Sequence, residues 1–340
     1  MKVLITGGAG FVGARLARTL LQAGMLCGRR LEQLVLADQA EASADLLADT
    51  RVSTRVGPLL THCEALRHEA FDGVFHLASA VSGECELDFD LGMRSNLDST
   101  RALLDALRTR VHAGAAPTRL VFSSSVAVFG PDASVAMPSR VADDTLPAPQ
   151  TSYGAQKLIC EHLIADYTRK GFIDGRAARL MTVTVRPGRP NGAASSFFSG
   201  IIREPLAGME SVCPVAATVA HPVSSPQRTV DGLIAVFEAS RAALGGRMGL
   251  NLPGLNVTVQ QMLDALEAVA GPKVRALVRF ERDERIAGIV ANWPTGATAA
   301  RAAALNLHAE RNFEDIIHQY IADQRGTAAL KGLDLKGLDA

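Results

Sequence analysis

Two residues four positions apart, Tyr153 and Lys157, are of the types needed to take a proton from an alcohol. A helix is predicted over 151–169 with Ser152 as its candidate N-cap, so the pair shares one helix face. A free tyrosine has a pKa of about 10, and a nearby ammonium group lowers that pKa by stabilising the phenolate. The pair therefore predicts a tyrosine that removes a hydroxyl proton while hydride leaves the same carbon.

A glycine-rich segment near the start, Thr6-Gly7-Gly8-Ala9-Gly10-Phe11-Val12-Gly13, lies between a predicted strand (2–6) and a predicted helix (11–23). A phosphate requires backbone N–H groups that no Cβ obstructs, and a helix N-terminus adds partial positive charge. Gly7, Gly10 and Gly13 meet this requirement in the correct strand-to-helix context. The segment predicts a site for the pyrophosphate of a dinucleotide.

The nearby acid Asp38 follows the second predicted strand (34–37), where a carboxylate can accept hydrogen bonds from the adenosine ribose. A carboxylate there repels a 2′-phosphate, which favours NAD over NADP. Arg29 and Arg30 leave NADP open, because a basic residue folded back could bind that phosphate.

Three consecutive serines, Ser123, Ser124 and Ser125, stand at the end of a predicted strand (119–123). A hydroxyl at such a strand end could hold the same substrate oxygen that Tyr153 deprotonates.

The elements that must position these residues alternate between strand and helix over the first half of the chain. This order predicts a doubly wound (Rossmann) α/β fold with a parallel sheet, and a smaller interleaved C-terminal substrate domain. We expect an NAD-binding domain over 1–186, a mainly substrate-binding domain over 187–325 with segments returning to the first, and a tail over 326–340. The further predicted strands are 52–56, 73–77 and 181–186; the further predicted helices are 96–110, 229–241, 259–270 and 312–324.

The composition excludes several classes of function. The 340 residues carry a formal net charge of zero, which leaves no electrostatic footprint for nucleic acid or a membrane surface. No apolar run is long enough to span a bilayer, and the five cysteines are scattered without metal-ligand spacing. We therefore expect a cytoplasmic protein with reduced thiols and no metal site.

These motifs together resemble the extended short-chain dehydrogenase/reductase family, which includes sugar-nucleotide epimerases. The resemblance covers roughly residues 1–325, and it also rests on His76-Leu77-Ala78-Ser79, Phe122 to Gly130, and Arg186-Pro187-Gly188. It implies catalysis by Ser125, with Ser124 as the fallback, together with Tyr153 and Lys157, and a homodimer through the helices after the fourth and fifth strands. The implied NAD contacts are Gly7, Gly10, Phe11, Val12, Gly13, Asp38, Leu77, Ala78, Ser79, Asn96, Ser123, Tyr153, Lys157 and Pro187.

Two positions depart from the family pattern. An acid that usually meets the adenine after the third strand is replaced by Gly57-Pro58-Leu59, so the adenine must be bound differently or by backbone groups. Phe129 stands where a tyrosine is common, and we interpret it as a packing residue.

The substrate must be recognised by the segments after the sixth predicted strand. A small hydroxy acid needs a fixed cation, and arginine offers a bidentate fork, so Arg189 and Arg228 are candidates. An ion pair with Asp231 is the alternative for Arg228. Asn191 and Ser196 could bind substrate hydroxyls or cap loops, and His221 could bind substrate or hold a structural hydrogen bond. The sequences of residues 186–228 and of Ala291-Asn292-Trp293-Pro294 resemble those of family members that oxidise a four-carbon sugar acid with NAD.

Other functions share part of this pattern. A nucleotide-sugar epimerase would use the same cofactor site and the same three catalytic residues with tightly bound NAD. A dehydratase is disfavoured, because Val126-Ala127 replaces the Asp-Glu pair expected there. A redox-sensing binding protein is disfavoured because the chain keeps both Tyr153 and Lys157.

Overall fold

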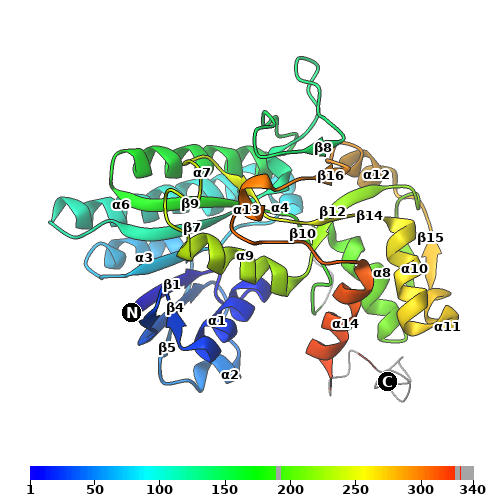
Figure 1. Ribbon diagram of the computed structural model, residues 1–340, viewed down its shortest axis with the longest axis horizontal. Helices are drawn as coiled ribbons and strands as arrows, with labels where there is room; N and C mark the ends of the chain where they lie inside the picture. Colours follow the sequence, from blue (N-terminus) through cyan, green and yellow to red (C-terminus); the bar gives the residue numbers. More distant parts are fainter. Residues whose placement is uncertain (189–192, 326–329, 331–340) are drawn as a thin grey trace.

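A seven-stranded parallel sheet forms the centre of the computed structural model, which describes residues 1–188, 193–325 and Leu330 (Figure 1). Every neighbouring pair of strands in it is parallel. The chain runs from β1 outward through its neighbour β4 to β5, then crosses to β6 on the other side of β1. In spatial order the strands are β13 (Leu250–Asn251), β9 (Ile173–Leu180), β7 (Thr118–Ser125), β6 (Gly73–His76), β1 (Lys2–Thr6), β4 (Gln33–Asp38) and β5 (Val52–Val56).

Helices cover both faces of this sheet, as the alternating strands require. Along β1, Val3 and Ile5 face one apolar cluster, and Leu4 between them faces another. The first cluster is closed by α1 (Phe11–Ala23) and α9 (Pro226–Glu238), and the second by α3 (Leu59–Leu66), α6 (Ser99–His112) and α7 (Ser152–Arg169). Strands buried on both faces and covered by helices confirm the predicted doubly wound α/β class.

A smaller lobe lies beside the carboxyl ends of the strands and has its own apolar cluster (Figure 1). It contains a mixed three-stranded sheet and several helices, while α9 and β13 from the same half of the chain pack against the first lobe. The division of domains at residue 186 stays a prediction. The elements of the smaller lobe are β10 (Thr182–Val183), β12 (Ala220–Ser224), β14 (Leu255–Thr258), β11 (Ser211–Cys213), β15 (Val278–Phe280), α8 (Ser196–Leu206), α10 (Val259–Ala270), α11 (Pro272–Arg275) and α14 (Phe313–Gln324).

Short elements connect these units. Two pairs of two-residue strands are β2 (Met25–Leu26) with β3 (Arg29–Arg30), and β8 (Arg140–Val141) with β16 (Gly296–Ala297). The short helices are α2 (Ala44–Leu47), α4 (Ser82–Leu87), α5 (Phe89–Gly92), α12 (Glu284–Val290) and α13 (Ala300–Ala303), with a π-helical turn at Met93–Asp98 and a 3₁₀ turn at Val126–Val128.

One predicted strand was placed wrongly. The central sheet contains Ile173–Leu180, whereas only Thr182–Val183 of the predicted 181–186 is in a strand, and that strand belongs to the smaller sheet. The sequence hides the true strand because Arg176 and Arg179 interrupt its apolar pattern. Both arginines are buried and paired, Arg176 with Asp174 at 2.9 Å and Arg179 with Glu161 at 2.8 Å.

No helix among the described residues has the length and apolar character needed to cross a membrane. Nor do the described ranges contain a group of three or more His, Cys, Asp or Glu side chains placed to hold a metal ion.

The Glu161–Arg179 pair generates a stability prediction. The Glu161 side chain is fully buried, and its Oε1 also accepts a hydrogen bond from Ser124. Glu161→Gln leaves a buried guanidinium without a counter-charge, so we expect the free energy of unfolding in urea to fall by about 3–5 kcal/mol. Asp166→Asn, on the same helix in an exposed pair with Arg169, is the matched control and should cost less than about 1 kcal/mol. Equal effects of the two changes would contradict the assignment.

Candidate active site

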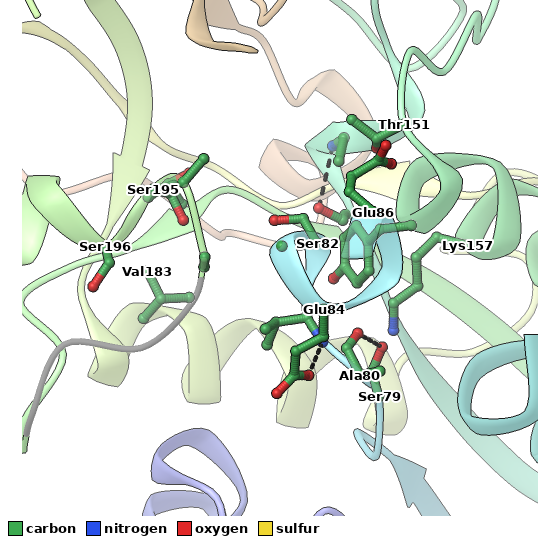
Figure 2. A pocket seen from close by; sticks show the side chains of 18 of the residues that line it. Ser79, Ala80, Ser82, Glu84, Glu86, Thr151, Lys157, Val183, Ser195 and Ser196 are labelled. Atoms are coloured by element: carbon green, nitrogen blue, oxygen red, sulfur yellow. Dashed lines mark hydrogen bonds between the residues drawn. The ribbon is translucent and has the colours of Figure 1, made fainter. Parts of the chain in front are cut away.

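A large cleft lies at the carboxyl ends of β1, β6 and β7, where the strand order reverses. Ligands bind at this switch point in open α/β sheets. The cleft measures about 2130 Å³, well beyond the roughly 1,000 Å³ of large ligand pockets, so a dinucleotide leaves room for a second small molecule. Figure 2 shows Val183, Ser195 and Ser196 on the side of the cleft opposite Ser79 and Lys157.

The glycine loop after β1 lines one end of this cleft with Gly7, Gly10, Phe11, Val12 and Gly13. Gly7 has a φ of 72°, in the left-handed region. A Cβ on Gly13 would lie 2.0 Å from the carbonyl oxygen of Gly7, so a side chain there would force the loop apart. The loop leads directly into the N-terminus of α1, and this cradle of bare backbone fits the pyrophosphate of NAD.

Asp38, the last residue of β4, lines the cleft beside the glycine loop. Its Oδ2 accepts a 2.9 Å hydrogen bond from the amide of Ala9, which ties the carboxylate to the loop. Arg29 and Arg30 form β3 and do not line the cleft, and Arg29 pairs with Asp72 at 2.9 Å. This placement supports a ribose-binding role for Asp38. Neither Arg29 nor Arg30 lies where it could bind the 2′-phosphate of NADP, which supports the proposed preference for NAD.

The segment expected to meet the adenine also lines the cleft. Gly57, Pro58 and Leu59 are followed there by Leu60 and Thr61. These residues offer apolar contacts and backbone groups in place of the carboxylate that the family pattern has at this point. The adenine end is therefore compatible with recognition by packing.

The turn after β6 forms the wall of the cleft between the glycine loop and β7, through Leu77, Ala78 and Ser79. Asn96, in the π-helical turn, is buried behind this wall. Its Oδ1 accepts hydrogen bonds from Ser79 Oγ at 2.9 Å and from the amide of Ala80 at 2.7 Å. Asn96 does not line the cleft, so it is better described as holding the turn than as touching a cofactor.

The three predicted catalytic residues come together in the middle of the cleft. The Ser125 hydroxyl lies close enough to Tyr153 to act on its pKa, and it accepts a 3.1 Å hydrogen bond from the Ala127 amide. The Nζ of Lys157 is buried, donates a 2.8 Å hydrogen bond to the carbonyl of Ser123, and lies 5.5 Å from the centroid of the Tyr153 ring. Helix α7 carries Tyr153 and Lys157 on one face, as predicted. Its N-cap is Thr151, whose Oγ1 accepts from the Gly154 amide at 3.0 Å, so the predicted cap at Ser152 was wrong by one residue.

The other two serines of the strand end do not present their hydroxyls in the same way. The Ser123 hydroxyl donates to the carbonyl of His76 at 3.3 Å. Ser124 donates to the buried Glu161 carboxylate. The fallback residue Ser124 is thus engaged in the structural ion-pair network, and Ser125 is the serine in contact with Tyr153.

Burial dominates the electrostatics of this centre. It raises the pKa of Tyr153 to about 12, while the hydrogen bond with Ser125 and then the charge of Arg186 act to lower that pKa. Burial also lowers the pKa of the Lys157 ammonium group to about 8. Arg186, which the sequence did not assign to this centre, therefore adds its positive charge to that of Lys157 beside the Tyr153 ring.

The predicted substrate residues fare differently. Ser196 is the first residue of α8 and lines the cleft, whereas Arg228 is an exposed residue of α9 that does not line it. Pro187, predicted to contact the cofactor, is also exposed and outside the lining. Arg189 and Asn191 lie outside the described residues. Sequence spacing could not show that Arg228 lies outside the cleft. The direction in which Arg228 points depends on how α9 packs against α1.

His221 lines the cleft but is committed to structural contacts. Its Nε2 lies 2.8 Å from Thr182 Oγ1 and its Nδ1 lies 3.1 Å from the carbonyl oxygen of Pro294. The ring stacks on Phe198 and contacts Trp293, and burial lowers its pKa to about 4. The structural alternative for His221 is therefore favoured over substrate binding.

Comparison with known proteins extends this description to the whole chain. The model of the NAD dependent epimerase/dehydratase family matches residues 3–220. A D-erythronate dehydrogenase from Cupriavidus necator is 46% identical over 331 residues, covering 95% of this chain and 98% of that protein. A D-erythronate dehydrogenase from Haemophilus influenzae is 42% identical, covering 94% of this chain and 99% of that protein. A solved structure described as a nucleoside-diphosphate-sugar epimerase from Agrobacterium tumefaciens matches with a TM-score of 0.90 and 43% identity, covering 97% and 96% of the two chains.

The glycine loop generates a binding prediction. In Gly13→Ala the new Cβ must displace the Gly7 carbonyl, and overpacking of this kind costs about 1–3 kcal/mol. We expect the dissociation constant of NADH, measured by fluorescence titration, to rise by at least about tenfold. Gly288→Ala, where nothing lies within 4 Å of the added Cβ, is the control and should bind NADH like the unaltered protein. Unchanged binding in Gly13→Ala would show that the cofactor lies elsewhere.

Proposed function

The chain belongs to the NAD dependent epimerase/dehydratase family and is an NAD-dependent oxidoreductase, and from this premise we propose that it oxidises D-erythronate. The proposed reaction converts the C2 hydroxyl of this four-carbon sugar acid to a ketone, giving 2-oxo-D-erythronate, NADH and a proton. The observation that carries the proposal is the contact between Ser125 and Tyr153 in a cleft large enough for NAD and a small acid.

Each residue has a distinct part in the proposed reaction. Ser125 holds the C2 hydroxyl, and Tyr153 accepts its proton. Lys157, fixed by the Ser123 carbonyl behind the Tyr153 ring, supports the phenolate from its buried position. The glycine loop and Asp38 hold the pyrophosphate and the adenosine ribose. When NAD⁺ is bound, its nicotinamide ring supplies the acceptor for the hydride that leaves C2.

A nucleotide-sugar epimerase is the second candidate, because the Agrobacterium tumefaciens structure carries that description. An epimerase returns the hydride to its substrate, so it produces no net NADH. The two functions are separated by following NADH absorbance with D-erythronate, with threonate and with UDP-glucose. We expect net NADH with D-erythronate. Turnover of UDP-glucose alone, without net NADH, would contradict the proposal.

Tyr153→Phe tests the proton acceptor. Removing the hydroxyl leaves no group to take the proton, so we expect kcat with D-erythronate to fall by about 10²–10⁴. The dissociation constant of NADH should change by less than about twofold, since the ring remains. Tyr167→Phe is the matched control, because Tyr167 lies on the same helix and bonds Asp105 away from the cleft. Retained turnover in Tyr153→Phe would exclude this mechanism.

The pH dependence follows from the raised pKa of Tyr153. Oxidation needs the phenolate, and with a pKa of about 12 the phenol dominates at neutral pH. The logarithm of kcat/KM for D-erythronate oxidation should therefore rise with pH, with a slope of about one, between about pH 6 and 8. Above about pH 8 the slope should decrease, because Lys157 loses its proton and its support of the phenolate. A profile that is flat from pH 6 to 8 would exclude Tyr153 as the base.

We also propose a cytoplasmic homodimer that takes part in sugar-acid catabolism. The helices expected at the dimer interface leave large apolar side chains uncovered nearby: Leu87 is 91% exposed, Phe89 60% and Ile159 43%. Large apolar side chains left this exposed are consistent with an interface, and we propose that the dimer covers them. Sedimentation equilibrium measures the association directly, and a monomer at micromolar concentration would contradict it.

A further inference from the structure

Arg186 stands at the junction of the cofactor loop and the reacting centre. It follows β10 in the chain, lines the cleft and is only partly exposed. Its Nε donates to the Val183 carbonyl at 3.0 Å, and its Nη2 donates to Ser195 Oγ at 3.0 Å. The guanidinium carbon lies 5.7 Å from the centroid of the Phe11 ring, which belongs to the cofactor loop. These contacts fix the orientation of the guanidinium plane.

No carboxylate in residues 1–188 and 193–325 lies within ion-pair distance of this fixed cation, and its charged neighbour Arg203 is itself paired with Glu204. Within the same ranges the hydrogen bonds of the Arg186 guanidinium use Nε and Nη2, and Nη1 donates none. A partly buried guanidinium is normally paired with an anion, so binding of an anionic ligand by Arg186 is favourable. Nη1 and the second N–H of Nη2 form the fork that a carboxylate accepts.

The other arginines of the cleft are poorer receptors. Arg94 and Arg285 line it but are exposed, where an ion pair contributes little because water screens it. Arg282 lines it and is paired with Glu284 at 2.7 Å. Lys157 is used by the Ser123 carbonyl and lies behind the Tyr153 ring. Within the described part of the cleft, Arg186 alone combines burial, fixed geometry and a free fork.

We propose that Arg186 binds the carboxylate of the substrate and gives the site its preference for a hydroxy acid over a neutral alcohol, an assignment that rests on the proposed oxidation of D-erythronate. Arg186 and Tyr153 line the same cleft, and the charge of Arg186 acts to lower the Tyr153 pKa, so a carboxylate bound by Arg186 enters the same part of the site as the hydroxyl that loses its proton. This neighbourhood suits a 2-hydroxy acid. The assignment replaces Arg228, which is exposed outside the cleft.

The test compares an acid with its neutral counterpart. D-Erythronate and D-erythronamide have the same carbon chain and hydroxyls, but only the first carries a carboxylate. For Arg186→Gln we expect KM for the acid to rise by about 100-fold and KM for the amide to change by less than about threefold, while kcat falls for both because Tyr153 loses a nearby positive charge. Arg186→Lys should restore part of the preference for the acid, and Arg282→Gln is the control from the same cleft wall. Equal rises in KM for acid and amide would indicate a structural role and overturn the assignment.

A binding measurement separates this assignment from the proposed reaction. Oxamate, a small carboxylate that is not oxidised, is titrated into the NADH complex and followed by NADH fluorescence. We expect Arg186→Gln to weaken oxamate binding by about 100-fold with unchanged NADH affinity, whether or not D-erythronate is the substrate. If the unaltered protein binds oxamate but does not oxidise D-erythronate, the proposed reaction is contradicted and the carboxylate-binding role of Arg186 is retained. If Arg186→Gln binds oxamate normally, or the unaltered protein does not bind it, the assignment fails.

A second variant covers the case in which Arg186→Gln does not fold. Ser195→Ala keeps the arginine and removes the acceptor that fixes its Nη2. We expect a smaller rise in KM for D-erythronate, of about three- to tenfold, and no effect on the amide. Loss of preference in Arg228→Gln, with none in Ser195→Ala or in Arg186→Gln, would overturn the assignment in favour of the exposed arginine.

Discussion

The close approach of two loops at the sheet's switch point is the constraint on which the cofactor half of the site depends. Thr6 ends β1, and its Oγ1 accepts from the amides of Leu77 and Ala78, both at 3.2 Å. The same oxygen lies 2.6 Å from Nδ1 of His76, the last residue of β6. A Cβ on Gly7 would lie 2.8 Å from the Ala78 amide nitrogen, so the two backbones can meet only without a side chain. The connections that follow β1 and β6 diverge beyond this contact, and the cleft lies between them.

Charged groups are paired differently in the core and in the cleft. In the core, Glu161 and Arg179 are buried as a matched pair, and Ser124 donates a further hydrogen bond to the carboxylate. In the cleft, the hydrogen bonds that Lys157 and Arg186 donate to described residues go to neutral oxygen atoms. A cation held by neutral groups keeps its electrostatic attraction for a charge that arrives later or develops during reaction. The first arrangement serves the fold, and the second suits a site that must stabilise a carboxylate and a phenolate.

The substrate end is supported by the smaller lobe. His221 joins β12 to the Trp293-Pro294 segment and to Thr182, and this segment follows directly after α12. Residues of α12 line the cleft, so the buried imidazole helps to set the position of that wall. Because epimerases and dehydrogenases share this fold, the choice of substrate depends on such walls and on the cations they leave unpaired.

Local patterns in the sequence determined most of the candidate cofactor site and of the proposed catalytic centre. The glycine loop, Asp38 at a strand end, and Tyr153 and Lys157 on one helix face follow from short-range spacing, which the backbone geometry of strands and helices converts directly into position. The alternation of side chains along a strand places Ser124 on the face opposite to Ser123 and Ser125. The strand Ile173–Leu180 could not be predicted in this way, because its two arginines interrupt the apolar pattern and are buried only with charged partners, Asp174 for Arg176 and the more distant Glu161 for Arg179. Only the tertiary structure showed that Arg228 is exposed and that Arg186 lines the cleft with Tyr153 and has no carboxylate partner among the described residues, since pairing and exposure depend on the packing of separate elements.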